Sequence, residues 1–285
     1  MYATANQSKL CYRFISYVHN EATQKFFTTY KGLEMKKNPV RHKLAKGQPT
    51  YGGWLAIPSG FSAEVMAHAG FDWLNIDMQH GLIDFSSLIN MLQVISTTDT
   101  VPIVRPLSND AAIIGQVLDA GARGVIVPMV NSREDAINAA QACRYAPRGI
   151  RSYGPARASI DLGVPYGEFP DSDALCLIML ETVEAINNIE DIASVPGIDG
   201  IFIGPGDLNV SMGLPPNNDS DNQQFMAALE KTLDVCDRNL LIPGIFADPN
   251  TAQKRFQQGF KFVPIAVDFG LLATGADNAL RLMRG

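Results

Sequence analysis

The sequence lacks the features that mark membrane, nucleic-acid-binding and disulfide-stabilised proteins. It has no run of about 18 apolar residues, so no membrane-spanning helix and no membrane partner are expected. The net charge is −6 and the lysines and arginines do not cluster, so no nucleic-acid partner is expected. The four cysteines, Cys11, Cys143, Cys176 and Cys236, form no CxxC pair. They predict reduced, mostly buried thiols in a cytoplasmic protein.

The first 34 residues differ from the rest of the chain. They lack the continuous apolar segment of a secretory signal. They have few acids and several basic and hydroxyl-bearing residues, as mitochondrial transit peptides do. A flexible extension, or translation from a start upstream of Met35, is the favoured interpretation, and mitochondrial targeting is the lesser one. We therefore treat 1–34 as an extension and 35–285 as one domain.

What the sequence does contain is a regular alternation of short apolar runs with amphipathic helical patterns. Eight runs are predicted strands: YGGWLAI (51–57), WLNID (73–77), VPIVR (101–105), GVIVPM (124–129), ALCLIML (174–180), GIFIG (200–204), LLIPGIF (240–246) and FVPIAV (262–267). Eight strand–helix units in roughly 250 residues predict an α/β fold, the (β/α)8 TIM barrel. A doubly wound open sheet is the alternative, but no GxGxxG follows the first run.

One connection is long. Residues 146–173 are predicted to be irregular, and loops of that length are typical of functional or interfacial segments. Their arginines, in PRGIRSYGPAR, would bind an anionic substrate group or make structural contacts, and the structural interpretation is favoured.

Polar residues stand at the C-terminal ends of four predicted strands, where barrels of this kind carry their active sites. They are Asp77, His80, Arg105, Glu181 and Asp207. Singly, each has a structural explanation, such as helix capping, an ion pair or a place in the first turn of a helix. Burying several charged groups together without partners costs much free energy, so their concentration at one rim indicates a functional site.

The two carboxylates on neighbouring strands, Glu181 and Asp207, suggest a hard divalent cation. Mg²⁺ and Mn²⁺ need only one or two protein carboxylates, and no second histidine or cysteine pair supports a zinc site. Such a site leaves positions for the carboxylate and keto oxygens of a 2-oxo acid. Arg105 can then stabilise the charge that grows on the keto oxygen as an enolate forms.

The segments ETVEAINNIEDIASVPGIDGIFIGPGDLNVSMG, AGFDWLNIDMQH, VPIVRP, VLDAGARGVIVPMV and RYAPRGIR resemble the HpcH/HpaI family of class II pyruvate aldolases. The resemblance runs in order from about residue 35 to the C-terminus. It implies a phosphoenolpyruvate/pyruvate-binding type of barrel. It also implies that Glu181 and Asp207 are the metal ligands, and that the amides of Gly206 and Asp207 bind the pyruvate carboxylate. The cofactor is then Mg²⁺ or Mn²⁺, with Co²⁺ as a further candidate.

The same resemblance implies the chemistry. The reaction is the reversible cleavage of a 4-hydroxy-2-oxo acid to pyruvate and an aldehyde, as in the breakdown of aromatic compounds. His80, oriented by Asp77, matches the general base that takes the proton of the C4 hydroxyl. Arg105 matches the arginine at the enolate oxygen. Many relatives carry Glu where this chain has Gln79, and some carry Gln where it has Met179, which puts the pH dependence and metal preference in question.

Three alternatives remain open at this point. Macrophomate synthase-like decarboxylation of oxaloacetate passes through the same enolate. A lysine Schiff-base aldolase needs a lysine at the C-terminal end of a strand, but the barrel lysines precede the first strand, lie in helices or, like Lys261, precede strand 8. A non-catalytic ligand-binding barrel is the third.

The resemblance further implies an assembly of identical chains. Hexamers or trimers are expected, in which the C-terminal helix is exchanged between subunits. The segment LLATGADNALRLM has an apolar face that could serve this exchange. An ordinary packed helix would show the same pattern.

Overall fold

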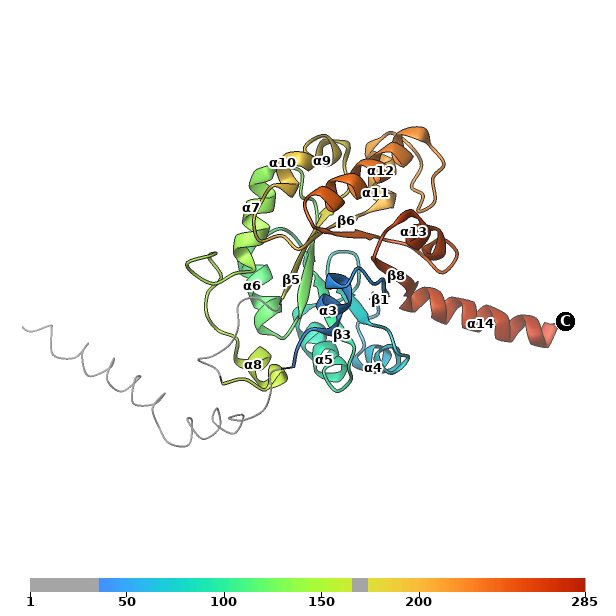
Figure 1. The fold of residues 1–285 in the computed structure, drawn as a ribbon. Coiled ribbons are helices and arrows are strands. Elements are labelled where there is room, and N and C mark those ends of the chain that lie inside the picture. Colours follow the sequence, from blue (N-terminus) through green and yellow to red (C-terminus); the bar gives the residue numbers. More distant parts are fainter. Residues whose placement is uncertain (1–35, 166–173, 285) are drawn as a thin grey trace, which may run out of the picture.

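The computed structural model describes residues 36–165 and 174–284, and the predicted extension 1–34 lies outside them. Eight parallel strands follow one another around a closed barrel, and β1 also pairs with β8. Helices cover the outside (Figure 1). The predicted (β/α)8 barrel is confirmed. Within the described residues, none of the helices has the length and apolarity needed to cross a membrane.

The strands are β1 (Thr50–Leu55), β2 (Trp73–Asp77), β3 (Val101–Arg105), β4 (Gly124–Val127), β5 (Leu175–Leu180), β6 (Gly200–Ile203), β7 (Ile242–Ile245) and β8 (Phe262–Val267). The helices are α3 (Pro39–Ala45), α4 (Gly60–His68), α5 (Phe85–Ile95), α6 (Ala111–Asp119), α7 (Arg133–Ala142), α8 (Ala156–Leu162), α9 (Val183–Asn187), α10 (Ile189–Ala193), α11 (Pro205–Ser211), α12 (Gln223–Arg238), α13 (Ala252–Gln258) and α14 (Asp268–Arg284).

Several predicted elements differ from the structure. β1 ends at Leu55 rather than at 57, and β4 ends at Val127 rather than at 129. β7 begins at Ile242 rather than at 240, because Leu240 has φ 56° and the Leu241 N–H closes α12 on the Cys236 carbonyl. The pattern EAINNIEDIAS (184–194) predicts one helix, but the structure has two, broken at Asn188, whose side chain donates to the Asn131 carbonyl at 2.9 Å. The connection 146–173 is not wholly irregular, since it contains α8; its residues 166–173 lie outside the described part.

Large aromatic side chains fill the barrel interior. The rings of Trp73 and Phe262 stack with centroids 3.8 Å apart, and Trp54 stacks on Phe202. Gly52 makes the space, because a Cβ there would lie 2.2 Å from the Trp73 ring. Burying one such side chain is worth about 1.5–3 kcal/mol. The interior is therefore a packed core that supports the rim above it.

Arginines fasten the N-terminal end of the barrel. Arg144 pairs with Asp199 at 3.0 Å and Arg151 with Asp119 at 2.6 Å. Arg157 donates to the Ala120 carbonyl at 2.6 Å. These contacts support the structural interpretation of the PRGIRSYGPAR segment. Cys143, Cys176 and Cys236 are buried and not disulfide-bonded, as predicted; Cys11 lies outside the described residues.

Candidate active site

The predicted site residues gather at the C-terminal ends of the strands. Asp77 ends β2 and Arg105 ends β3, and the two residues are partners in the register of the sheet. Glu181 directly follows β5. Asp207 lies in the first turn of α11, which begins right after β6 and Gly204. The parallel ladder thus brings residues up to 130 positions apart to one rim.

Asp77 and Arg105 form a buried, two-point ion pair. Arg105 Nε donates to Asp77 Oδ1 at 2.8 Å, and Nη2 donates to Oδ2 at 2.5 Å. Trp54 supports both residues: its Nε1 donates to Asp77 Oδ2 at 3.1 Å, and its ring lies 5.0 Å from the guanidinium carbon. Burial raises the pKa of Asp77. The Arg105 hydrogen bonds and charge, with the Trp54 and His80 N–H groups, outweigh burial and hold the pKa below its usual value.

His80 meets Asp77 through its main chain. Its backbone N–H donates to Asp77 Oδ1 at 3.2 Å, and the neighbouring Gln79 N–H donates to the same oxygen at 3.1 Å. The imidazole is exposed and takes part in none of the hydrogen bonds among the described residues. The contact of Asp77 with His80 in this structure is therefore to the main chain, and both Asp77 oxygens also accept from Arg105.

Glu181 is buried beside the other acid. The Met129 main-chain N–H donates to its Oε1 at 2.8 Å. Its Oε2 lies against Gly204, where a Cβ would come within 2.9 Å of it. Burial raises the pKa of Glu181 and the negative charge of Asp207 raises it further, against the opposing effects of the Met129 N–H and Arg105. Folding therefore places an acid that is hard to ionise next to a second acid.

The segment that carries Asp207 is shaped by glycine and proline. Pro205 occupies the first turn of α11, where its missing N–H costs nothing. The Asp207 side chain is exposed and accepts no hydrogen bond from the described residues. Its N–H and that of Gly206 lie in the first turn, where main-chain donors lack helical partners.

The donor set fits a hard divalent cation. Glu181 keeps one oxygen uncommitted and Asp207 keeps both, and the negative charge of Asp207, which raises the pKa of Glu181, would be offset by a positive charge between the two carboxylates. Oxygen ligands of this kind suit Mg²⁺ or Mn²⁺. Among 36–165 and 174–284, no cluster of three or more His, Cys, Asp or Glu residues is arranged as a metal site.

Comparison with known proteins identifies the family. A family model described as HpcH/HpaI aldolase/citrate lyase matches residues 51–274. The chain belongs to this family. Its membership confirms the resemblance noted in the sequence and the prediction of a carbon–carbon lyase.

Individual relatives cover nearly the whole barrel. The chain is 39% identical over 244 residues to the hydroxypyruvate/pyruvate aldolase of Rhizorhabdus wittichii, covering 85% of this chain and 97% of the relative. It is 40% identical over 245 residues to a 4-hydroxy-2-oxo-heptane-1,7-dioate aldolase of Salmonella dublin, covering 85% and 92%. An HpcH/HpaI family protein from Burkholderia cenocepacia superposes with a TM-score of 0.81 at 28% identity, covering 87% of this chain and 100% of that structure.

Two residues that contact the predicted site residues were missed in the sequence. Trp54 lies in the C-terminal half of β1, so the same search for polar groups at strand ends could have found its indole N–H. Met129 contributes only its main-chain N–H, and a methionine gives no sign of that in a sequence. Met179, one of the two departures from the family, touches Arg105: its sulfur lies 3.9 Å from Nη1.

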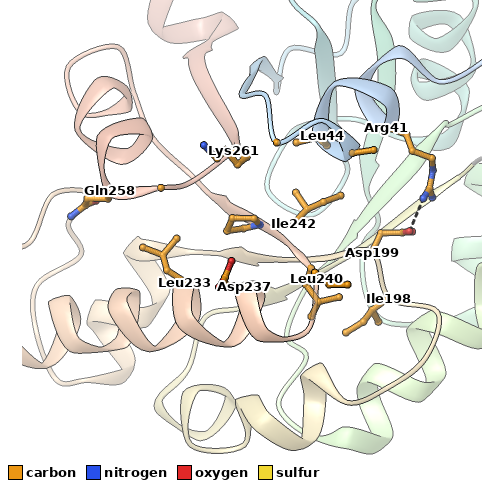
Figure 2. Close-up of a pocket in the computed structure, with 15 residues that line it drawn as sticks. Arg41, Leu44, Ile198, Asp199, Leu233, Asp237, Leu240, Ile242, Gln258 and Lys261 are labelled. Atoms are coloured by element: carbon orange, nitrogen blue, oxygen red, sulfur yellow. Dashed lines mark hydrogen bonds and ion pairs between the residues drawn. The ribbon is translucent and has the colours of Figure 1, made fainter.

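A cavity of about 530 Å³ lies at the opposite, N-terminal end of the aldolase barrel (Figure 2). Ile198, Asp199 and Lys261, which line it, immediately precede β6 and β8. Arg41 of α3 crosses its wall to Asp199 at 2.8 Å. None of the predicted site residues lines this cavity, so it takes no part in the site at the strand C-termini.

Proposed function

We propose that the enzyme cleaves a 4-hydroxy-2-oxo acid reversibly to pyruvate and an aldehyde, with Mg²⁺, Mn²⁺ or Co²⁺ held by Glu181 and Asp207. The observation that carries the proposal is the meeting of these two carboxylates, one buried, on the rim that also bears the Asp77–Arg105 pair. The names of the two relatives at about 40% identity, both aldolases, support it.

In this proposal, different groups of the protein bind the substrate and stabilise the enolate charge. A bound divalent cation would polarise the keto oxygen and stabilise the enolate charge. The Gly206 and Asp207 amides bind the substrate carboxylate. Arg105, held in one orientation by Asp77 and Trp54, supplies fixed positive charge for the keto oxygen.

His80 moves the proton in the same scheme. The imidazole accepts the proton of the C4 hydroxyl while the C4 oxygen forms the aldehyde carbonyl. The electron pair of the broken C3–C4 bond becomes the enolate, and protonation at C3 then gives pyruvate. The exposed His80 imidazole makes no hydrogen bond to the described residues and so has the freedom to reach the substrate.

The test compares two carboxamide variants with a matched control. Glu181→Gln and Asp207→Asn each remove one anionic ligand, so we expect pyruvate release to fall at least about a hundredfold and to fall likewise with a chelator. Glu190→Gln changes an exposed acid on α10 that pairs with Arg238 and is not one of the predicted site residues, so it should keep wild-type activity. Substrates are a panel of 4-hydroxy-2-oxo acids and, separately, oxaloacetate.

Each alternative has its own outcome. Turnover of oxaloacetate alone would favour the decarboxylase. Trapping of a covalent adduct by borohydride, or full activity in the Glu181 and Asp207 variants, would contradict the metal mechanism. No turnover of any substrate with added metal would favour a ligand-binding barrel.

We also propose that identical chains assemble, as trimers or hexamers, through α14. This helix projects from the barrel (Figure 1), and apart from Asp268 its described residues are not buried. Phe269, Leu272, Leu282 and Met283 are among its exposed side chains, with Leu282 86% exposed. Soluble proteins rarely leave so long an apolar face without a partner.

A groove on the outer wall of the barrel offers a seat for the helix of a second chain. It is lined by α13, including Phe256, and by Tyr51 of β1 and Ile265 of β8. Leu272→Glu should therefore yield monomers in sedimentation velocity, whereas Leu240→Glu, at an exposed leucine on the other end of the barrel, should leave the assembly intact. An unchanged assembly in Leu272→Glu would argue against exchange of α14.

A further inference from the structure

Met129 has an unusual main-chain conformation. Its φ is 55°, and among the described residues only Leu240 shares a positive φ without being glycine. Non-glycine residues adopt this region at a cost and mostly where the surroundings impose it. Met129 is half-exposed, so burial of its side chain does not account for the strain.

The surroundings of Met129 hold the strained turn in place. Pro128, with its restricted φ, precedes it. On the far side, the Val130 N–H donates to the Met179 carbonyl of β5 at 3.2 Å. Asn131 then accepts from the Thr182 hydroxyl at 2.5 Å. The turn is thus fastened at its far end to the strand and cap that flank Glu181.

The consequence of the strain is the direction of one N–H. The Met129 amide points at Glu181 Oε1, and no other hydrogen bond among the described residues reaches this carboxylate. One oxygen is thereby occupied. The other, Oε2, lies against Gly204 at the start of the segment that leads to Asp207.

We infer that the Pro128–Met129 turn is a positioning device for the metal site, in which a strained main-chain amide holds Glu181 by one oxygen and leaves the other for the cation. This rests on the proposed function, since it takes Glu181 to be a metal ligand. Groups that orient metal ligands typically contribute tenfold to a hundredfold in metal affinity. The Met129 side chain has no part in this role, so its identity should matter little.

The experiment isolates the N–H by comparing an ester and an amide that carry the same side chain. Leucic acid, the hydroxy-acid counterpart of leucine, introduced at position 129 replaces the amide by an ester, and Met129→Leu is its amide-bearing partner. Leucic acid at position 240 is the matched control, because Leu240 has φ 56° and lies at the N-terminal end of the barrel. Binding of Mn²⁺ to the metal-free proteins is followed by the loss of the free-ion signal in electron paramagnetic resonance.

We expect Met129→Leu and the ester at 240 to bind Mn²⁺ like the wild type, and the ester at 129 to bind about tenfold to a hundredfold more weakly. Equal binding by the ester and the leucine at 129 would overturn the inference, as would equal weakening by the two esters. Weakening in Met129→Leu itself would assign the effect to the side chain and also overturn it. Failure of the wild type to bind Mn²⁺ is a separate result, which removes the proposed metal site and this inference with it.

A second measurement needs no metal and applies if the ester at 129 does not fold. In ¹⁵N-methionine-labelled protein, the amide resonance that disappears in Met129→Leu is that of Met129. In Glu181→Gln it should move upfield, because a neutral oxygen accepts a weaker hydrogen bond than a carboxylate. An unmoved resonance would show that the amide does not hold Glu181.

Discussion

Gly204 offers the sharpest steric test of the site. A Cβ at this position would lie 2.9 Å from Glu181 Oε2, 3.0 Å from Glu181 Cβ and 3.4 Å from the Met179 sulfur. The main chain itself tolerates alanine, since φ is −94° and ψ is 89°. The effect of Gly204→Ala is therefore a steric one, and the atom nearest to the new methyl group is the oxygen that we assign to the cation.

The size of the effect follows from the distances. Ordinary contact begins at 3.4 Å, so Oε2 must retreat by about 0.5 Å, while Oε1 is held by the Met129 N–H and Cβ is itself too close. Misplacing a catalytic group by 1 Å can cost about a hundredfold, so half that displacement should cost about tenfold in kcat/KM and in Mn²⁺ affinity. Overpacking should also cost about 1–3 kcal/mol of stability, or about 2–4 °C in Tm for each kcal/mol.

The assay couples pyruvate release to NADH oxidation by lactate dehydrogenase and is paired with Mn²⁺ titration and thermal unfolding. Gly115→Ala is the control. Gly115 lies within α6, and a Cβ there would meet nothing closer than Arg151 Cγ at 4.0 Å. Alanine there should keep activity and stabilise the helix by about 0.5–1 kcal/mol. Wild-type turnover and Mn²⁺ affinity in Gly204→Ala would refute the placement of Oε2 in the metal site.

Three further predictions concern the Asp77–Arg105 pair. The folded-state pKa of Asp77 lies below its ordinary value of 3.8, so its charge stabilises the fold above that pH, and this contribution is lost as the pH falls through the lowered pKa. The difference in unfolding free energy between wild type and Asp77→Asn should therefore be largest near neutral pH and disappear in acid, as measured by urea unfolding across pH. A gap that widens in acid would contradict this. Arg105→Lys cannot make the two-point contact, so kcat should fall about a hundredfold or more in the coupled assay, and near-normal kcat would mean that a point charge suffices. Trp54→Phe keeps a ring beneath Arg105 but removes the donor to Asp77 Oδ2, so urea unfolding should show a loss of about 1 kcal/mol, and no loss would show that this hydrogen bond contributes nothing net.

The predicted elements that match the structure best are those whose local signals agree. β2, β3 and β8 begin and end where their apolar runs do, at Trp73–Asp77, Val101–Arg105 and Phe262–Val267. These strands are apolar on both faces because helices cover the outside and aromatic rings fill the inside. β7 and the α9–α10 break departed from prediction because a single residue, Leu240 or Asn188, adopts a conformation set by its neighbours in space.

The sequence predicted which residues lie together at the rim but not how they contact one another, and their roles in catalysis stay a prediction. Asp77, Arg105, Glu181 and Asp207 could be gathered from the sequence, since parallel strands in a barrel all end on the same rim. The sequence did not show that the Asp77 carboxylate binds the Arg105 side chain and contacts His80 only at its main-chain N–H. A side-chain contact between Asp77 and His80 would fit the same residues and spacing.

The sequence by itself determined the eight strand–helix units, the family and the polar residues at one rim, because periodicity and order along the chain suffice for these. Only the tertiary structure decided which atoms meet. The Met129 amide on one oxygen of Glu181, and Gly204 against the other, depend on backbone angles and side-chain packing between β4, β5 and β6. Such contacts are set by the register and spacing of strands far apart in the chain, and no local pattern encodes them.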